Sequence, residues 1–227
     1  MKDDNPLLDG LFKELSAIAA DSQDNVYAAD RQLGRIQKFT RDGAFVLKWG
    51  GSFSDIQGIA VDGADNVYIA DAGSDYHVKK FSSSGTLIAQ WGSRGASPGQ
   101  SDYLSGIAVD AQGNVYTVDR SNSVAFTVSK FSSSGTFLLG WGRIGTGPGE
   151  FAHPSGLAPG IAVDKAGNVY VLDAGNQRVQ KFTSQGVFLG EKFIGSQENP
   201  MTFKGIATDS TDTIYVLGDR TVIFTLQ

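Results

Sequence analysis

The chain repeats one pattern of hydrophobic and polar positions, in which two short apolar segments flank a small polar turn. Its clearest copy spans residues 58–71, where the apolar segments 59–61 and 67–70 stand on either side of the polar residues 62–66. Segments of this length, rich in β-branched and aromatic residues, are typical of β-strands, and the polar turn between them is typical of a hairpin. The pattern therefore predicts an antiparallel pair of strands.

This pattern occurs five times. Each copy has an aspartate at the end of the first segment, a tyrosine six positions later, and a phenylalanine that ends a third apolar segment. A fourth segment ends in Trp-Gly in three copies and in Phe-Ile-Gly at residues 193–195. The repeated aspartates, spaced by 41, 48, 54 and 45 residues, are Asp21, Asp62, Asp110, Asp164 and Asp209. Four strands in each of several repeats of about 40–50 residues are typical of a β-propeller.

The predicted fold is therefore all-β, a propeller of four-stranded antiparallel blades. We expect an N-terminal segment over residues 1–14, in which residues 5–10 offer at most a short closing strand, and a propeller over residues 15–227. The blades are expected at residues 15–51, 56–92, 104–142, 158–195 and 203–227. The sequence of the last blade ends just after the third strand, so this blade lacks an outer strand of its own.

Two motifs carry a family resemblance. Gly-Ile-Ala-Val-Asp followed by Asn-Val-Tyr, together with Arg-Val-Gln-Lys-Phe at residues 178–182, resemble NHL repeats, and the resemblance covers about residues 15–227. It implies a propeller of a family that includes binding platforms for proteins, RNA or glycans, sensor ectodomains, and relatives of lyases and hydrolases. Because six blades are common in the family, two interpretations stay open. Either five blades close on themselves, or a missing blade comes from elsewhere or from a second copy.

Composition narrows the classes of partner. Among 227 residues there are 29 glycines and only 6 prolines, which is consistent with many tight turns. The net charge of −5 and the lack of a Lys/Arg run argue against nucleic acid or an anionic membrane surface as the partner. No apolar window is long enough for a membrane span, and the first six residues carry no apolar signal-peptide core. Cysteine is absent, so the cellular compartment is left undetermined.

Residues that recur in every repeat are expected to serve the fold. Asp62 and Asp71 end the two strands of one hairpin, roughly 15–20 Å apart, so they are expected to bond turn amides and cap loops rather than form an acid–base pair. The tryptophans of the fourth segments are expected to pack between blades. The lysines before the third-strand phenylalanine are expected to be solvated residues near the blade edge, namely Lys38, Lys80, Lys130 and Lys181.

Catalytic groups are not expected at the propeller axis. The inner ends of the first strands, where propeller enzymes hold metal ligands, lack His, Asp and Glu and consist of Ser16-Ala17, Gln57-Gly58, Ser105-Gly106, Pro159-Gly160 and Lys204-Gly205. A zinc site of several histidines would need more than the two in this chain, His77 and His153. We therefore predict no catalytic residue, no metal and no cofactor.

Insertions in the repeat fall on one side of the blades. The turns between strands one and two and between strands three and four are nearly constant, whereas the loops between strands two and three and the connections between blades vary, the longest being 143–159. Loops on a rigid scaffold are where binding usually resides. The arginines and aromatic residues of these loops, a mixture typical of contact surfaces, are Tyr76, His77, Arg94, Tyr103, Arg120, Phe126, Arg143, Phe151, His153 and Arg178.

The sequence therefore predicts a non-enzymatic scaffold that presents these residues to a protein or glycan partner. One alternative is a lyase or hydrolase with an axial, metal-dependent site. The other is a structural or assembly module that self-associates through the incomplete last blade.

Overall fold

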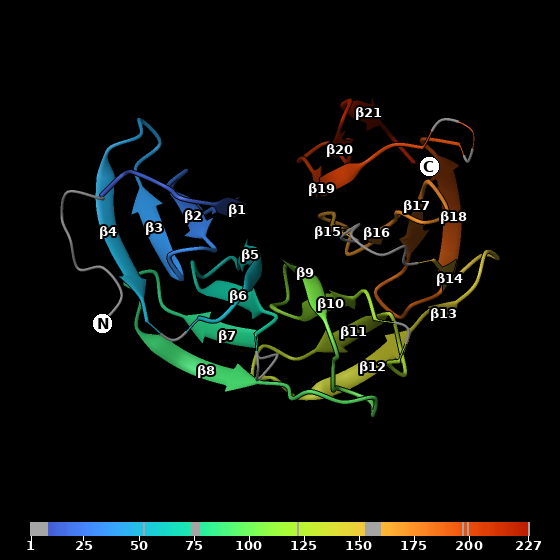
Figure 1. Ribbon diagram of the computed structural model, residues 1–227, viewed down its shortest axis with the longest axis horizontal. Coiled ribbons are helices and arrows are strands. Elements are labelled where there is room, and N and C mark those ends of the chain that lie inside the picture. Colours follow the sequence, from blue (N-terminus) through green and yellow to red (C-terminus); the bar gives the residue numbers. More distant parts are fainter. Residues whose placement is uncertain are drawn as a thin grey trace. The chain divides into compact units, whose positions relative to one another are not determined.

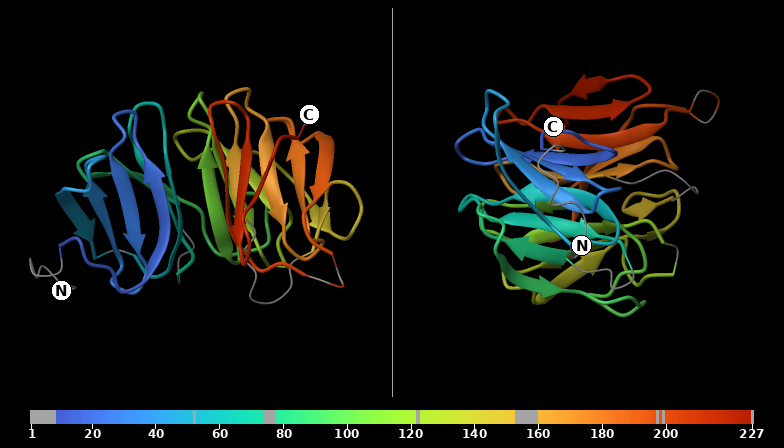
Figure 2. Two further views of the ribbon diagram at one scale, coloured as in Figure 1. Left: turned by 90° about the horizontal axis from the view of Figure 1, so that it is seen from above. Right: turned by 60° about the vertical axis from the view of Figure 1, so that its left-hand side comes forward.

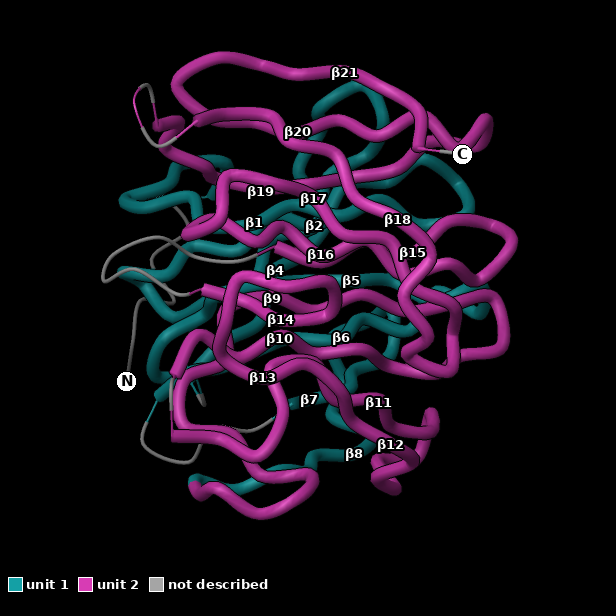
Figure 3. Tube along the Cα trace, turned by 90° about the vertical axis from the view of Figure 1, so that its right-hand side faces the viewer, with its two compact units in different colours: residues 1–94 teal, residues 95–227 magenta. Residues whose placement is uncertain are grey.

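The computed structural model describes residues 9–51, 53–73, 78–121, 123–152, 160–196, 198 and 200–226. In these residues the protein is all-β, which confirms the predicted fold class, and each blade is an antiparallel meander whose strands pair in chain order (Figure 1). The chain divides into two compact units, residues 1–94 and 95–227 (Figure 3). None of the described residues forms a helix long and apolar enough to cross a membrane.

Unit 1 holds two blades. Blade 1 consists of β1 (Leu15–Ala20), β2 (Val26–Asp30), β3 (Arg35–Phe39) and β4 (Phe45–Gly50). Blade 2 consists of β5 (Ile56–Val61), β6 (Val67–Asp71), β7 (Val78–Phe81) and β8 (Leu87–Trp91). The two sheets pack face to face, and the core between them includes Tyr27, Ala29 and Ile36 from blade 1 and Ile59, Val67, Ile69 and Phe81 from blade 2.

Unit 2 holds three blades and a short pair of strands. Blade 3 consists of β9 (Leu104–Val109), β10 (Val115–Asp119), β11 (Val128–Phe131) and β12 (Phe137–Trp141). The short pair is β13 (Arg143–Ile144) and β14 (Glu150–Phe151). Blade 4 consists of β15 (Ile161–Val163), β16 (Val169–Asp173), β17 (Arg178–Phe182) and β18 (Phe188–Phe193). Blade 5 has only three strands, β19 (Phe203–Thr208), β20 (Ile214–Gly218) and β21 (Val222–Phe224).

The second strand of each complete blade is its most buried element. Strands β6, β10 and β16 are buried along their whole length, which explains their nearly continuous apolar sequences. Two of the three fourth-strand tryptophans, Trp49 and Trp141, pack between the blades of one unit, as predicted. The ring of Trp49 lies 5.9 Å from that of Phe81 in blade 2, and the ring of Trp141 lies 5.8 Å from that of Phe182 in blade 4.

Hydrogen bonds around the first aspartate hold the hairpin turn of each blade. In blade 2, Asp62 accepts hydrogen bonds from the amides of Ala64 and Asn66, both at 2.9 Å, and from the Tyr68 hydroxyl at 2.9 Å. Burial opposes the charged form, but the hydrogen bonds from Asn66 and Tyr68 outweigh it and lower the pKa of Asp62. Burial, together with the negative charge of Asp62, raises the pKa of Tyr68. The predicted structural role of these aspartates is confirmed.

The third-strand lysines are not solvated, and the prediction for them is wrong. Lys38 Nζ lies 3.0 Å from Asp21 Oδ2 and 4.8 Å above the ring of Tyr27, and its side chain is mostly buried. Lys130 is buried and donates a hydrogen bond to the Ser184 carbonyl of the next blade at 3.1 Å. The third strand does not lie at the edge of the sheet, because the fourth strand pairs outside it, and in unit 2 the next blade covers its lysine.

The turns and the loops gather at opposite ends of the strands in each blade. We call the end with the turns between strands one and two and between strands three and four the turn side (Figure 2). The loop side is the end with the loops between strands two and three and the connections between blades. On that side, the described residues of the predicted closing strand, Asp9 and Gly10, form a turn rather than a strand.

Candidate functional site

The connection between blades 3 and 4 organises the loop side of unit 2. Its two ends pair as parallel strands, with Arg143 opposite Glu150. The Glu150 carboxylate accepts hydrogen bonds from Arg143 Nε and from the Gly147 amide, both at 3.0 Å. These bonds lower the pKa of Glu150, with the Gly147 amide as the largest cause. Residues 142–151, called the connector below, therefore form a compact loop with its own internal structure, which the sequence did not predict.

A buried arginine holds the connector onto blade 4. Arg178 is only 2% exposed, and its Nη2 donates to the carbonyls of Gly147 and Glu150 at 2.8 and 2.9 Å. The Nε atom of Arg178 donates to Asp173 at 2.9 Å and Nη1 donates to Glu191 at 2.7 Å. An arginine fork with every nitrogen satisfied is a rigid support.

A neighbouring glutamine completes this support. Gln180 Nε2 donates to the Glu150 carbonyl at 2.7 Å, and Gln180 Oε1 accepts a hydrogen bond from the Gly149 amide at 2.8 Å. Phe151 at the end of the connector is fully buried, with its ring 5.9 Å from that of Phe182. The connector is thus fixed at both its backbone and its last side chain.

The first hollow, of about 410 Å³, lies on the blade 3 side of the connector. Its lining includes Phe126, Arg143 and the connector residues 148–150. The Phe126 ring stacks on that of Phe137, with centroids 6.4 Å apart and planes at 15°. The Arg143 side chain is 83% exposed. This hollow, which we call the Phe126 hollow, combines an ordered aromatic wall with a solvated guanidinium.

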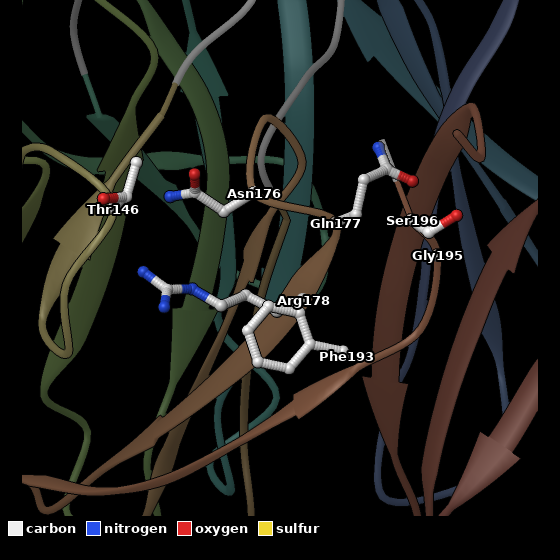
Figure 4. Close-up of a pocket in the computed structure, with 7 residues that line it drawn as sticks. All are labelled: Thr146, Asn176, Gln177, Arg178, Phe193, Gly195 and Ser196. Carbon is white, nitrogen blue, oxygen red and sulfur yellow. The ribbon is translucent and has the colours of Figure 1, made fainter. Parts of the chain in front are cut away.

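The second hollow, of about 500 Å³, lies on the blade 4 side of the connector. Figure 4 shows its lining residues, which are Thr146, Asn176, Gln177, Arg178, Phe193, Gly195 and Ser196. The Phe193 side chain is 59% exposed, and the Arg178 guanidinium lies 5.9 Å from its ring centroid. Asn176 donates to the Gly145 carbonyl of the connector at 2.9 Å. The hollow, called the Phe193 hollow below, therefore offers an aromatic surface between fixed amide groups.

A third feature of this side is a stacked pair in blade 3. The guanidinium carbon of Arg120 lies 3.7 Å from the ring centroid of Tyr103. Asp119 anchors this region by accepting hydrogen bonds from the amides of Asp102 and Tyr103 at 2.8 and 3.0 Å. Burial raises the pKa of Asp119 despite these bonds.

The structure brings some of the predicted site residues together. Phe126 and Arg143 line one hollow, Arg120 stacks on Tyr103, and Arg94 is exposed. Phe151 and Arg178 are buried, and Arg178 holds the connector through its backbone carbonyls. Three of the predicted residues lie outside the described part of the chain, namely Tyr76, His77 and His153.

Of the seven residues that line the Phe193 hollow only Arg178 was predicted, and two of the other six, Phe193 and Asn176, give the hollow its chemistry. Phe193 pairs with Arg178 as Gly50 pairs with Arg35, so it stands where three other blades have the glycine of Trp-Gly, and Lys192 stands where they have tryptophan. The signal that could have identified Phe193 is the loss of Trp-Gly in this copy. Asn176 lies in a tight turn between strands two and three and carried no comparable signal. Among the described residues, no group of three or more His, Cys, Asp or Glu side chains is placed to hold a metal ion.

Comparison with known proteins gives one match to a family model and several solved structures of similar fold. Residues 160–182, which contain the first three strands of blade 4, match the model of the NHL repeat. The match falls in one of five propeller blades built on the same pattern, so this β-propeller contains an NHL repeat. No curated protein matches the sequence of this propeller.

Several solved structures share the fold of this propeller. Virginiamycin B lyase from Staphylococcus aureus, in a catalytically inactive form with quinupristin, is 16% identical with a TM-score of 0.67 over 94% of this chain. A nidogen/laminin complex contains a chain 17% identical with a TM-score of 0.68 over 93% of this chain. This chain covers 66% of the lyase and 76% of the chain in the complex, so it spans only about two thirds of the lyase's length. At these identities the likeness shows the fold alone.

Proposed function

We propose that this propeller is a non-enzymatic binding scaffold and that the loop side of unit 2 holds a protein partner. The observation that carries the proposal is the clamped connector with a hollow on each side. Arg178 and Gln180 hold its backbone through four hydrogen bonds of 2.7–2.9 Å, so the walls of both hollows are preformed. A preformed surface loses little conformational entropy on binding.

The chemistry of the two hollows favours a protein segment. Phe126 and Phe193 offer aromatic surface, and Arg143, which pairs with Glu150, keeps most of its side chain exposed to a partner. Aromatic residues and arginine are the side chains most enriched at the energetic centres of protein interfaces. Two shallow hollows divided by the connector fit two side chains of one extended segment. A glycan is the alternative occupant, because an exposed aromatic ring also stacks on sugars.

Binding can be tested with defined probes. The biotinylated protein is applied to a peptide array and to a glycan array, and each hit is measured by isothermal titration calorimetry. The variant Phe126→Ala/Phe193→Ala is expected to weaken a peptide hit at least about tenfold, because buried aromatic anchors are worth more than 1.4 kcal/mol.

A turn-side variant of blade 4 serves as the matched control. Lys165→Ala/Val187→Ala alters two exposed residues of the same blade and is expected to leave the dissociation constant unchanged. Loss of binding in this control, or full binding by the loop-side variant, would contradict the proposed face. A hit on the glycan array alone would make the partner a glycan.

The alternative, an enzyme with an axial metal site, makes a different prediction. A resident metal binds the folded state and raises the melting temperature by mass action. After treatment with a chelator, the scaffold is expected to melt at the same temperature with calcium, magnesium or zinc as without them. A specific upward shift with one of these ions would favour the enzyme.

A further inference from the structure

Two blades carry an arginine directly after the second aspartate of their hairpin, the one that ends strand two. They are Arg31 in blade 1 and Arg120 in blade 3, whereas the other blades have alanine or aspartate at this position. The Arg31 amide donates to the Glu14 carbonyl at 2.9 Å. In the same way, the Arg120 amide donates to the Tyr103 carbonyl at 3.1 Å. The backbone therefore places both arginines alike, and their side chains can be compared.

The guanidinium of Arg31 has two carboxylates as partners. It forms an ion pair with Glu14 of its own blade, and its Nε atom lies 3.7 Å from Asp55 Oδ1 of blade 2. Blades 1 and 2 both belong to unit 1. An arginine at this position thus bridges its own blade and the next blade of the same unit, on the loop side.

Around Arg120 the first of these carboxylates is replaced by an aromatic ring. Tyr103 stands where blade 1 has Glu14, and the guanidinium carbon of Arg120 lies 3.7 Å from the Tyr103 ring centroid. Stacking on a ring holds a guanidinium in place and leaves the N–H groups in its plane available as donors. Within the described part of the chain, the Arg120 side chain forms no hydrogen bond and no ion pair.

The second carboxylate is missing from the sequence of blade 4. The residue that corresponds to Asp55 there is His153, because the preceding residues, Ser54 and Ala152, both donate their amides to the second aspartate of the hairpin. His153 lies outside the described residues, but the sequence has no Asp or Glu from residue 151 to residue 163. Blades 3 and 4 belong to one unit, so this junction without an acidic residue lies within unit 2.

The carboxylates on the loop side of blade 3 are engaged with other groups. Asp119 accepts hydrogen bonds from the amides of Asp102 and Tyr103, at 2.8 and 3.0 Å. Asp102 accepts hydrogen bonds from the hydroxyls of Ser121 and Ser123, at 2.7 and 2.9 Å. Neither carboxylate forms an ion pair with the stacked arginine. The guanidinium therefore keeps its donors for a group from outside the blade.

The stacked arginine stands close to the Phe126 hollow. Asp119 donates its amide to the Thr127 carbonyl at 2.8 Å, and this bond closes the loop of residues 120–126. Arg120 and Phe126 are the two ends of that loop, next to the same backbone hydrogen bond. Residues i and i+2 of an extended segment lie about 7 Å apart and point to the same side. A segment with an apolar side chain in the hollow can thus bring a neighbouring side chain to the guanidinium.

A carboxylate fits this site better than a phosphate. The planar fork of one guanidinium pairs with both oxygens of a carboxylate, and the two charges balance. A phosphate group carries close to two negative charges at neutral pH, so a single guanidinium would leave part of its charge uncompensated. The other arginine at the hollow, Arg143, already pairs with Glu150 at 3.0 Å.

We propose that Arg120, held in place by Tyr103, binds a carboxylate of the partner segment whose apolar side chain enters the Phe126 hollow. This inference rests on the proposed function and names the chemistry of its partner, an acidic peptide. The carboxylate takes the place beside Arg120 that Asp55 has beside Arg31, at the junction of blades 3 and 4.

Paired peptides test the proposal. An array carries short peptides that combine one aromatic or branched residue with one Asp or Glu, and each is printed beside the same peptide with Asn or Gln instead. The biotinylated 1–227 chain is expected to bind the acidic member of a pair at least about tenfold more tightly, because hydrogen bonds between two charged groups are among the strongest at interfaces.

Four variants show whether the stacked arginine causes this preference. Arg120→Gln is expected to abolish it and to lower the melting temperature by less than about 2 °C, since no ion pair among the described residues is broken. Tyr103→Leu is expected to reduce the preference, whereas Tyr103→Phe preserves it because the ring that holds the guanidinium remains. Arg31→Gln, at the same position of blade 1, is the matched control and leaves the preference unchanged.

Four outcomes would overturn the proposal. If both members of each pair bind equally and Phe126→Ala weakens both, the hollow stands and the carboxylate site is wrong. If no peptide binds, the proposed function fails and this inference fails with it. If Arg120→Gln lowers the melting temperature by several degrees and leaves the preference intact, the arginine pairs with a carboxylate of the chain itself. If only acidic sugars of a glycan array bind, the carboxylate does not come from a peptide.

Discussion

The turn side and the loop side are the two ends of the same strands. The side-chain interactions on the turn side are nearly the same in all blades, whereas those on the loop side vary from blade to blade. On the turn side every blade repeats an aspartate that binds the turn amides and a tyrosine, with hydrogen bonds from the tyrosine hydroxyl of 2.9–3.3 Å. On the loop side, the second aspartate of the hairpin accepts hydrogen bonds from amides of the preceding connection in blades 1 to 4, whereas its charged partner varies and blade 5 has Gly218 at this position. The comparison shows that the chemistry of the side chains varies at the loop end of the strands and is constant at the turn end.

The second aspartates show how far the loop side has diverged. Asp71 pairs with Lys79 at 2.8 Å, and Asp173 pairs with Arg178 at 2.9 Å. Asp119 has backbone amides as partners, and Ser129 occupies the position of Lys79. The charged partner of this carboxylate is therefore an arginine in blades 1 and 4 and a lysine in blade 2, and the described partners in blade 3 are backbone amides.

The largest effect is expected on the loop side, at Arg178. Arg178→Met leaves the buried Asp173 without its cation, and this is expected to lower the free energy of unfolding by about 3–5 kcal/mol. The measurement is urea unfolding followed by circular dichroism. The matched control is Arg143→Met in the same connector, which is exposed and is expected to cost less than about 1 kcal/mol. Equal effects of the two variants would contradict the clamp.

The next effect concerns the lysine of the turn side. Burial favours neutral Asp21, but hydrogen bonds from Asn25 and Lys38 outweigh it and lower the pKa of Asp21 to about 2. Because the folded-state pKa lies below the unfolded value of about 4, Asp21 stabilises the fold above pH 4, and this stability is lost as the pH falls toward 2. Lys38→Met is expected to cost about 1.5–3 kcal/mol at neutral pH and to move acid unfolding to higher pH. An unchanged acid midpoint would argue against this role.

A smaller effect is expected from a single hydroxyl. Tyr68→Phe removes a buried hydrogen bond to Asp62 and is expected to cost about 0.5–1.5 kcal/mol, measured by thermal unfolding. Tyr215 makes the same bond, at 2.9 Å to Asp209, but it is exposed in blade 5. Tyr215→Phe is therefore the control and should cost less. A larger cost at Tyr215 would mean that burial does not set the strength of this network.

The smallest effect is a gain. Ser129→Lys introduces the lysine that blade 2 has at this position, Lys79, and places an ammonium group near Asp119. Burial raises the pKa of Asp119. Because ionised Asp119 destabilises the fold above its unfolded pKa, the lysine is expected to add up to about 1 kcal/mol at pH 7 and less at pH 4. Ser129→Met controls for size. A gain of the same size at both pH values would point to packing instead of charge.

Repetition made the fold predictable from the sequence. Five aligned copies showed the strands, and they showed that Asp62 and Tyr68 belong to a turn. The burial of Lys38 could not be predicted, because strand alternation does not tell which positions a tyrosine ring and an aspartate will enclose. The burial of Arg178 could not be predicted for a similar reason. Its side chain is buried because two carboxylates and two connector carbonyls satisfy it, and those groups come from distant positions in the chain.

The candidate site was predicted less well than the fold. Variable loop length pointed to the connector, and Phe126 and Arg143 do line a hollow there. The loop that pairs Arg143 with Glu150 has glycine at 145, where an added Cβ would lie 2.1 Å from Glu150 Oε2, and at 149, where φ is +75°. No periodic pattern in the sequence predicts such a loop. Phe193 stands in the Phe193 hollow at a position where three other blades have glycine, and this change is visible only when the four complete copies are aligned.

The pairing of every strand with its neighbour in the chain has a kinetic consequence. Within a blade each strand pairs with a strand that is next to it in the sequence, so the loops that close during folding are short and the entropic cost of closing them is low. We therefore expect blades to form as local units and to dock in succession, as in a one-dimensional array. Such an array can gain or lose a whole blade without rethreading the rest of the chain.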